Sequence, residues 1–326
     1  MSLSPRAAVL GGLLLALLIA APAFLDRYLL SVLIVSLYFA YVGQAWNLLM
    51  GYAGLLSLGH ALYVGLGAYA SAYLYAAHGI TPLLGLFVGV AAASLMGVII
   101  GALGFRFRIE GVYFALLTIA FAEFIRIGFD HIPATGGSGG YFLPLPPGGS
   151  DPWSLRGGPV LFYYVILGLT VAALALTRYL VNSRVGYQWR AIREDPEAAR
   201  ALGVDVFRLR LGAVALSAGL TSIGGVFTAF YYNTMLPEQM FGIHRSIEMI
   251  LGPIVGGLGT VFGPIVGAFV LTPMGEGLIA LADGLGLNVP GLKAVVYGLA
   301  LIVIVKFRPG GLWPWIARKL GLEERA

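Results

Sequence analysis

The chain has 326 residues, of which 59% are hydrophobic and only 11% are charged, and its mean hydropathy is +0.89. This composition excludes a water-soluble globular protein, because most of the chain has to be solvated by lipid. The absence of cysteine excludes disulfides, thiolate catalysis and thiolate metal sites. The formal net charge of +5 requires no nucleic-acid partner to explain it.

A series of apolar stretches predicts membrane helices, each of which needs roughly 20 apolar residues to span. In chain order, the predicted helices cover residues 7–22, 28–49, 55–77, 82–104, 111–130, 159–180, 209–232, 245–257, 260–282 and 291–307. The segment 245–257 is too short to span comfortably and is expected to be re-entrant. The sequence therefore predicts an all-α polytopic transmembrane bundle of about 9–10 membrane segments, some broken, forming one domain over residues 1–326.

Basic residues are unevenly distributed over the loops between these helices. If the loop 181–208 is cytoplasmic, the opposite side of the membrane holds only Arg27, Arg156, Arg245 and Lys293. The positive-inside rule then places both termini in the cytoplasm. The long loop 131–158 would lie outside, and its Gly-rich run 135–140 (TGGSGG) and the prolines at 144, 146, 147 and 152 predict a structured or re-entrant element.

No nucleotide-binding motif accompanies that glycine run. Neither Gly-Lys-Ser nor Gly-Lys-Thr occurs anywhere in the chain, so a phosphate-binding loop is absent. This polypeptide alone is not expected to hydrolyse ATP.

A charged amphipathic island, residues 186–210, interrupts the apolar sequence. Asp195 is a good N-cap, Pro196 suits the first helical position and Gly203 suits the C-cap. These residues predict a short helix outside the bilayer that a cytoplasmic partner grips. The alternative is a solvated loop helix without a partner.

Two glycine-rich stretches resemble each other. Residues 51–54 (GYAG), Gly59 and 67–69 (GAY) parallel residues 256–259 (GGLG), Gly263 and 267–269 (GAF). Both would run from the cytoplasm outwards, which suggests a parallel internal repeat with the translocation route at its interface. The alternative is chance similarity between two helix-packing seams in a glycine-rich chain.

Six segments in order resemble the LivM-type permease subunits of ABC importers for branched-chain amino acids. They are 46–60 (WNLLMGYAGLLSLGH), 111–120 (GVYFALLTIA), 135–140 (TGGSGG), 191–203 (AIREDPEAARALG), 256–268 (GGLGTVFGPIVGA) and 307–312 (FRPGGL). The resemblance extends from about residue 41 to residue 312. It implies a multi-pass protein of the bacterial or archaeal cytoplasmic membrane that performs no covalent chemistry.

The resemblance also implies partners. In ABC importers a Glu-Ala-Ala-x-x-x-Gly segment is the coupling helix that seats on an ATPase subunit, and residues 197–203 fit it, although the Ile-x-Leu-Pro that follows in the fuller motif is missing. The expected partners are a second homologous permease subunit, two cytoplasmic ATPase subunits that carry ATP and Mg²⁺, and an extracytoplasmic substrate-binding protein. The ATPase-coupling residues are then Arg193, Glu194, Asp195, Pro196, Glu197, Ala198, Ala199, Arg200 and Gly203. The small alanines would permit close approach of the ATPase, and the charges would fix its register.

Polar groups within the predicted helices are candidates for the translocation path, because ionisable side chains in a membrane are costly. The candidates are Gln44, Asn47, His60, Tyr113, Thr118, Glu123, Arg126 and Glu248. Glu123 and Arg126, three residues apart, can instead form a structural ion pair, and Gln44 and Asn47 can instead bind neighbouring helices. Helix breaks and packing are assigned to Gly51, Gly54, Gly59, Gly256, Gly259, Gly263 and Gly267. The four histidines show no close ligand spacing, so no metal site is expected.

Leucine, isoleucine or valine is the expected cargo, with urea, short amides and other amino acids left open. A rival interpretation is a secondary transporter that couples protons through Glu123, Glu248 or Glu276. A membrane-embedded enzyme would need a cluster of catalytic groups, which the sequence does not offer.

Overall fold

The protein is described here by a computed structural model that covers residues 5–144, 152–286 and 291–321. Helices dominate it, and its only sheet in the described part is one short antiparallel pair, in which Tyr141 lies opposite Met235. The elements, in chain order, are α1 (Pro5–Ala20), η1 (Ala21–Ala23), α2 (Arg27–Asn47), η2 (Leu48–Tyr52), α3 (Ala61–His78), α4 (Pro82–Arg106), α5 (Val112–Asp130), η3 (Pro133–Thr135), η4 (Gly137–Gly139), β1 (Tyr141–Phe142), η5 (Pro152–Ser154), α6 (Pro159–Val181), α7 (Arg184–Glu194), α8 (Pro196–Ala201), α9 (Val206–Tyr232), β2 (Thr234–Met235), α10 (Pro237–Phe241), α11 (Ile243–Gly256), α12 (Gly263–Gly284), α13 (Leu292–Phe307) and α14 (Leu312–Leu320).

Six of the described helices are long and apolar enough to cross a membrane: α2 with η2, α4, α5, α6, α9 and α12. The pair α13 and α14 also passes this test, although it is bent by 56°. The predicted all-α polytopic bundle is therefore confirmed. The segment expected to be too short for a span forms α11, which has only 14 residues.

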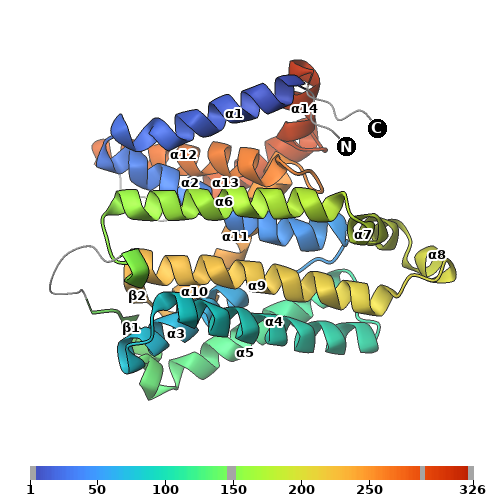
Figure 1. Cartoon of the computed structure of the whole chain (residues 1–326), viewed down its shortest axis with the longest axis horizontal. Coiled ribbons are helices and arrows are strands. Elements are labelled where there is room, and N and C mark those ends of the chain that lie inside the picture. Colours follow the sequence, from blue (N-terminus) through green and yellow to red (C-terminus); the bar gives the residue numbers. More distant parts are fainter. Residues whose placement is uncertain (1–4, 145–151, 287–290, 322–326) are drawn as a thin grey trace.

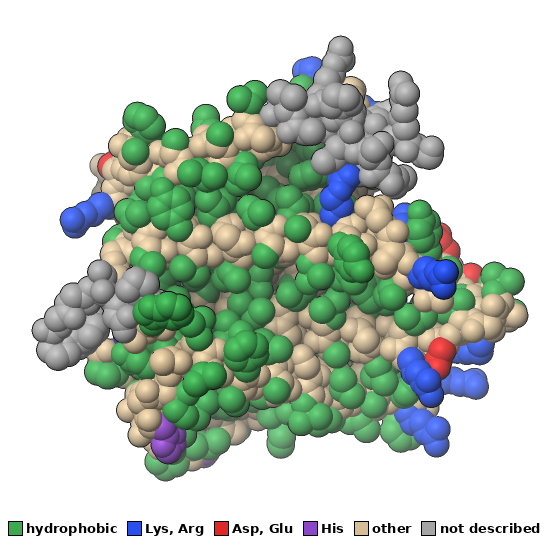
Figure 2. Space-filling view, viewed as in Figure 1, with side chains coloured by type: hydrophobic (Ala, Val, Ile, Leu, Met, Phe, Trp, Pro, Cys, Tyr) green, Lys and Arg blue, Asp and Glu red, His purple; other side chains and the backbone are tan. Residues whose placement is uncertain are grey.

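Two helices form the centre of the bundle. In their most apolar stretches α2 and α9 are 78% buried, whereas α4, α5 and α12 are only 22–28% buried. Side chains such as Phe87, Leu95 and Phe124 are exposed on these outer helices. Hydrophobic atoms cover most of the face in Figure 2, as expected for a surface that contacts lipid tails.

Glycines allow the central helices to approach closely. A Cβ added to Gly67 on α3 would overlap the Ser222 carbonyl on α9, and one added to Gly225 would overlap the Val64 carbonyl on α3. Lipid gives helices little hydrophobic reason to associate, so such backbone contacts supply much of the packing. These contacts account for part of the glycine content of the sequence.

Several helix boundaries differ from the prediction. The helix expected at 55–77 begins only at Ala61, because residues 53–60 leave the helix after the π-helical turn η2 and Gly54 adopts a φ of +71°. The helix expected at 209 begins at Val206, where the Asp205 carboxylate accepts a hydrogen bond from the Arg208 backbone N–H at 3.0 Å. The helix expected at 260 begins at Gly263.

The two ends of the bundle differ in composition. Figure 1 shows α7, α8, α14 and the start of α1 at one end, and β1 and β2 at the other. We call these ends the α8 side and the β side. Lys and Arg side chains gather at the α8 side in Figure 2, as the predicted charge asymmetry requires. The predicted loop 131–158 forms η3, η4, β1 and η5 on the β side, and its residues 145–151 lie outside the described part.

Candidate functional site

The predicted helix in the charged island exists as α8. The Asp195 carboxylate accepts hydrogen bonds from the backbone N–H groups of Glu197 and Ala198 at 2.8 and 3.0 Å, and Pro196 occupies the first helical position. Gly203 follows the helix with a φ of +85°, which favours glycine. Local capping chemistry therefore fixes both ends of a helix of only six residues.

The two faces of α8 differ. Ala199 is 2% exposed and packs with Ile192 of α7 and Val206 of α9. It therefore faces the chain's own small core, whereas the sequence suggested that it faces a partner. Ala198 and Ala201 are exposed, and Leu202 just beyond the helix is 84% exposed. The apolar Leu202, in the middle of a charged island, is an exposed residue that the sequence interpretation omitted.

Helix α7 is tied to three other elements. Trp189 donates its indole N–H to the Leu209 carbonyl on α9 at 3.0 Å, and Arg190 Nη2 donates to the Val181 carbonyl at the end of α6 at 2.7 Å. Arg193 Nη1 donates to the carbonyl of Gly51 in η2. Helix α7, which precedes α8 in the chain, is thus bonded to α6, α9 and the π-helical turn.

Arg193 also fills the space between two glycine-rich breaks. The first break covers residues 48–60, between α2 and α3, and the second break covers residues 257–262, between α11 and α12. A Cβ on Gly54 would lie 2.9 Å from Arg193 Cγ, and one on Gly259 would lie 2.8 Å from Arg193 Nη1. Both glycines have positive φ, +71° and +70°. The sequence treated Arg193 as a group that fixes the register of a partner, but its Nη1 points inward while its Nε lies 3.8 Å from the exposed Glu194 carboxylate.

Two amide side chains of α2 join the first break to the second. Asn47 Nδ2 donates to the Thr260 carbonyl and its Oδ1 accepts from the Gly259 N–H, both at 2.9 Å, while Gln44 Nε2 donates to the Val261 carbonyl at 3.0 Å. Both amides therefore perform the packing role that was the alternative to lining a path. An added Cβ would crowd neighbouring atoms at every glycine assigned to breaks or packing: Gly51, Gly54, Gly59, Gly256, Gly259, Gly263 and Gly267.

His60 and Thr118 hold the extended segment before α3. Ser217 Oγ donates to the Ala45 carbonyl at 2.7 Å, so His60 Nε2 must donate to Ser217 Oγ at 2.8 Å, and His60 Nδ1 then accepts from Ser57 Oγ at 3.1 Å. Thr118 Oγ1 accepts hydrogen bonds from the backbone N–H groups of Leu58 and Gly59, just before α3, at 3.1 and 3.2 Å.

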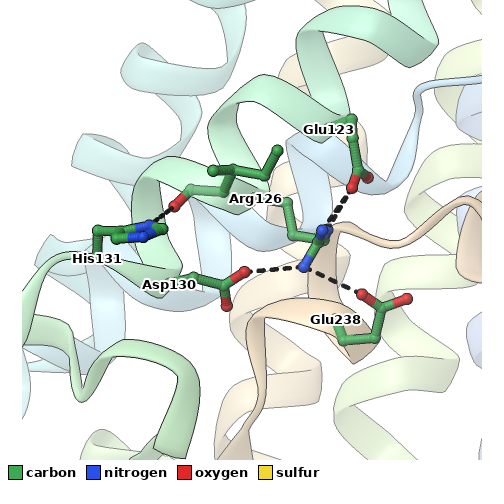
Figure 3. Close-up of polar contacts among 6 residues, drawn as sticks. Glu123, Arg126, Asp130, His131 and Glu238 are labelled. Atoms are coloured by element: carbon green, nitrogen blue, oxygen red, sulfur yellow. Dashed lines mark hydrogen bonds and ion pairs between the residues drawn. The ribbon is translucent and has the colours of Figure 1, made fainter.

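Glu123 and Arg126 form an ion-pair network on the β side (Figure 3). Arg126 Nε donates to Glu123 Oε1 at 2.9 Å, and Arg126 Nη1 lies 2.8 Å from the Asp130 carboxylate and 3.2 Å from that of Glu238. In the same view, His131 Nδ1 donates to the Ile127 carbonyl at 2.8 Å. The network ties α5 to α10, which is the structural alternative considered for this pair.

Glu248 belongs to a second charged group, assembled from α11, α12 and α13. Its carboxylate lies 3.9 Å from Arg245 Nη1 and 3.6 Å from Lys293 Nζ, and Lys293 Nζ lies 3.3 Å from Glu276 Oε1. We call Arg245, Glu248, Glu276 and Lys293 the charged cluster. The sequence singled out Glu248 and Glu276 but no signal joined them to Arg245 and Lys293, because the helices meet only in the fold.

Tyr113 lies apart from the other path candidates. It is 75% exposed on the first turn of α5 and lines a surface hollow with Arg108 and Glu110. Within the described ranges, no group of three or more His, Cys, Asp or Glu side chains is placed to hold a metal ion.

The comparisons with known proteins bear on this arrangement. The family described as branched-chain amino acid transport system / permease component matches residues 28–305, which include both breaks, α7, α8 and the charged cluster. The chain belongs to this family. It is accordingly a multi-pass membrane protein and a transport component.

Relatives within the permease family cover most of the chain. The LivM permease protein of the high-affinity branched-chain amino acid transport system of Escherichia coli strain K12 is 29% identical over 96% of this chain and 76% of its own length. The LivH permease protein of the same strain is 24% identical over 88% of this chain and 94% of its own length. The probable LivM permease protein of Methanocaldococcus jannaschii is 22% identical over 84% of this chain and 89% of its own length. No solved structure matches the chain.

Proposed function

We propose that this permease is one of two non-identical membrane subunits of an ABC importer for branched-chain amino acids. Its relatives LivM and LivH are both named as permease proteins of a branched-chain amino acid transport system. Two related permease names in one strain support a heteromeric pair. The chain itself has no phosphate-binding loop, so ATP and Mg²⁺ would be bound by two cytoplasmic ATPase subunits.

The observation that carries the proposal is the exposed helix α8. It is capped at both ends, rests on its own core through Ala199 and presents Ala198, Ala201 and Leu202 to the outside. A rigid, partly apolar helix on the most basic side of a membrane protein is suited to a groove on a cytoplasmic partner. This orientation puts the α8 side in the cytoplasm and the β side outside.

In this proposal, closure of the ATPases pushes α8, and α7 carries the push into the membrane domain. The Arg193 bond to Gly51 transmits it to the first break, and the Asn47 bonds transmit it from there to the second break near Gly259 and Thr260. The backbone at each break lacks the regular hydrogen bonds of a helix, so the chain can bend there at low energetic cost. The two breaks would open and close the path together.

The test is purification of the tagged chain from its native membrane in mild detergent, followed by mass spectrometry of the proteins that accompany it. We expect a second permease of the same family and two ATPase polypeptides. The variant Leu202→Asp should lose the ATPases but keep the second permease, because Leu202 is 84% exposed and the change leaves the fold intact.

The matched control is Leu320→Asp, an exposed leucine on α14 at the same end of the bundle. It should retain all partners. Undiminished ATPase recovery with Leu202→Asp would contradict the docking role of α8. Recovery of wild-type chain without any ATPase would contradict the importer proposal itself.

A further inference from the structure

The charged cluster lines a cavity on the β side of the bundle. The cavity has a volume of about 180 Å³ and includes Tyr28, Ser31, Val32, Val35, Phe39 and Tyr232 beside the four charged residues. Tyr232, Arg245 and Glu248 also line a neighbouring cavity of about 490 Å³ between α9, α10 and α11. Two cations and two carboxylates gathered at a partly buried site are costly unless a function retains them.

The ion pairs of Glu248 are loose. Its carboxylate lies 3.9 Å from Arg245 and 3.6 Å from Lys293, whereas Lys293 Nζ donates a hydrogen bond to Glu276 Oε1 at 3.3 Å. By contrast, Arg126 holds its carboxylates at 3.2 Å or closer. Charges that serve only to tie helices together are expected to reach hydrogen-bonding distance, as those around Arg126 do. Glu248 therefore has unused hydrogen-bonding capacity.

Unpaired polar atoms lie next to the cavity. The Arg245 guanidinium stacks on Tyr38, with its central carbon 4.9 Å from the ring centroid. Both Arg245 Nε and the Tyr38 hydroxyl are buried, and neither forms a hydrogen bond with any residue that the structure describes. Buried donors without partners are costly, so a carboxylate that reached Arg245 would find a donor still available.

We infer that this cavity binds the head group of an amino-acid substrate on its way through the permease, a role that rests on the proposed function. A free amino acid carries one carboxylate and one ammonium group. Arg245 offers its fork of N–H donors to the carboxylate, and Glu248 accepts from the ammonium group. Val32, Val35 and Phe39 on the adjoining face of α2 provide an apolar surface for a branched aliphatic side chain.

The position of the cluster fits this role. Arg245 lies in the first turn of α11, Lys293 in the first turn of α13 and Tyr28 in the first turn of α2. All three therefore lie near the β side, opposite α8. A substrate released outside would meet this cavity early. Lys293 bridges Glu248 and Glu276, so a substrate ammonium group that displaces Lys293 from Glu248 leaves it paired with Glu276. The net charge of the cavity remains zero throughout.

The experiment is uptake of radiolabelled L-leucine by proteoliposomes that contain the complete complex with its binding protein and internal ATP. Arg245→Gln and Glu248→Gln should each lower uptake about 10-fold or more at unchanged binding-protein-stimulated ATP hydrolysis. The matched control is Arg27→Gln, an exposed cation at the same end of the bundle, which should leave uptake unchanged.

A charge exchange, Arg245→Glu with Glu248→Arg, separates a binding role from a structural one. It restores an ion pair on α11 but reverses the positions of the two charges relative to the apolar face. We expect assembly and ATP hydrolysis to remain at the wild-type level while leucine uptake stays low. Recovery of uptake in the exchanged variant, or wild-type uptake in both single variants, would overturn the site. Failure of the wild-type complex to take up leucine would instead refute the proposed function.

Discussion

Arg193 connects the proposed coupling region to the helix breaks, so its removal should uncouple transport. In Arg193→Ala the bond from Nη1 to the Gly51 carbonyl is lost, and the space between Gly54 and Gly259 is emptied. The exposed surface of α8 is unchanged. The ATPases should therefore still bind and hydrolyse ATP.

The magnitude follows from that bond. A hydrogen bond from a charged donor contributes about 1.5–3 kcal/mol, which corresponds to about a 10- to 150-fold weaker bias of α7 on the first break. The number of leucine molecules taken up for each ATP hydrolysed should fall by a comparable factor. Arg193→Lys keeps a charge and a donor but lacks the planar fork, so its ratio should lie between those of Arg193→Ala and the wild type.

The assay is parallel measurement of leucine uptake and phosphate release in proteoliposomes containing the whole complex. Arg184→Ala serves as control, because Arg184 is exposed on the first turn of the same helix. A wild-type ratio in Arg193→Ala would refute the transmission argument. An equal fall in Arg184→Ala would show that the basic charge of α7, and not the bond to Gly51, is responsible.

The remaining predictions concern α8 and the join between the breaks. Asp195→Ala should destabilise α8 by about 1 kcal/mol, seen as faster hydrogen exchange of its amides, and unchanged exchange would contradict the capping role. Ala198→Trp should fold and lose the ATPases, whereas Ala199→Trp should lower the yield of folded protein because it overfills the core with Ile192; the reverse pattern would contradict the orientation of α8. Asn47→Leu leaves two backbone groups unpaired at about 1–3 kcal/mol each, so the apparent melting temperature should fall, and an unchanged value would contradict the bridge.

Helix positions were predictable because their signals are local. Asp195 and Pro196 start α8, Pro159 starts α6, and the apolar runs set the lengths of the long helices. The start of α3 was predicted too early, because the chain leaves the helix through a π-helical turn. The mostly apolar residues 55–58 resemble the helix that follows, so the sequence does not indicate this change.

The candidate site was predictable only in part, because it depends on contacts distant in sequence. The amide of Asn47 bonds residues more than 200 positions away, and the charged cluster joins α11 to α13. No spacing of residues in the sequence predicts the Asn47 hydrogen bonds or the charged cluster. The exposure of Leu202 could have been inferred from an apolar residue in a charged island, whereas the burial of Ala199 required the positions of α7 and α9.

We propose that this permease moves substrate with energy that ATPase partners deliver through α8. The most direct test is the energy requirement of L-leucine uptake by proteoliposomes that contain the purified complex and its binding protein. We predict uptake that requires internal ATP and continues in the presence of a protonophore. Uptake by this chain alone, driven by a proton gradient without ATP, would contradict the account and favour a transporter in which Glu123, Glu248 or Glu276 carries the proton.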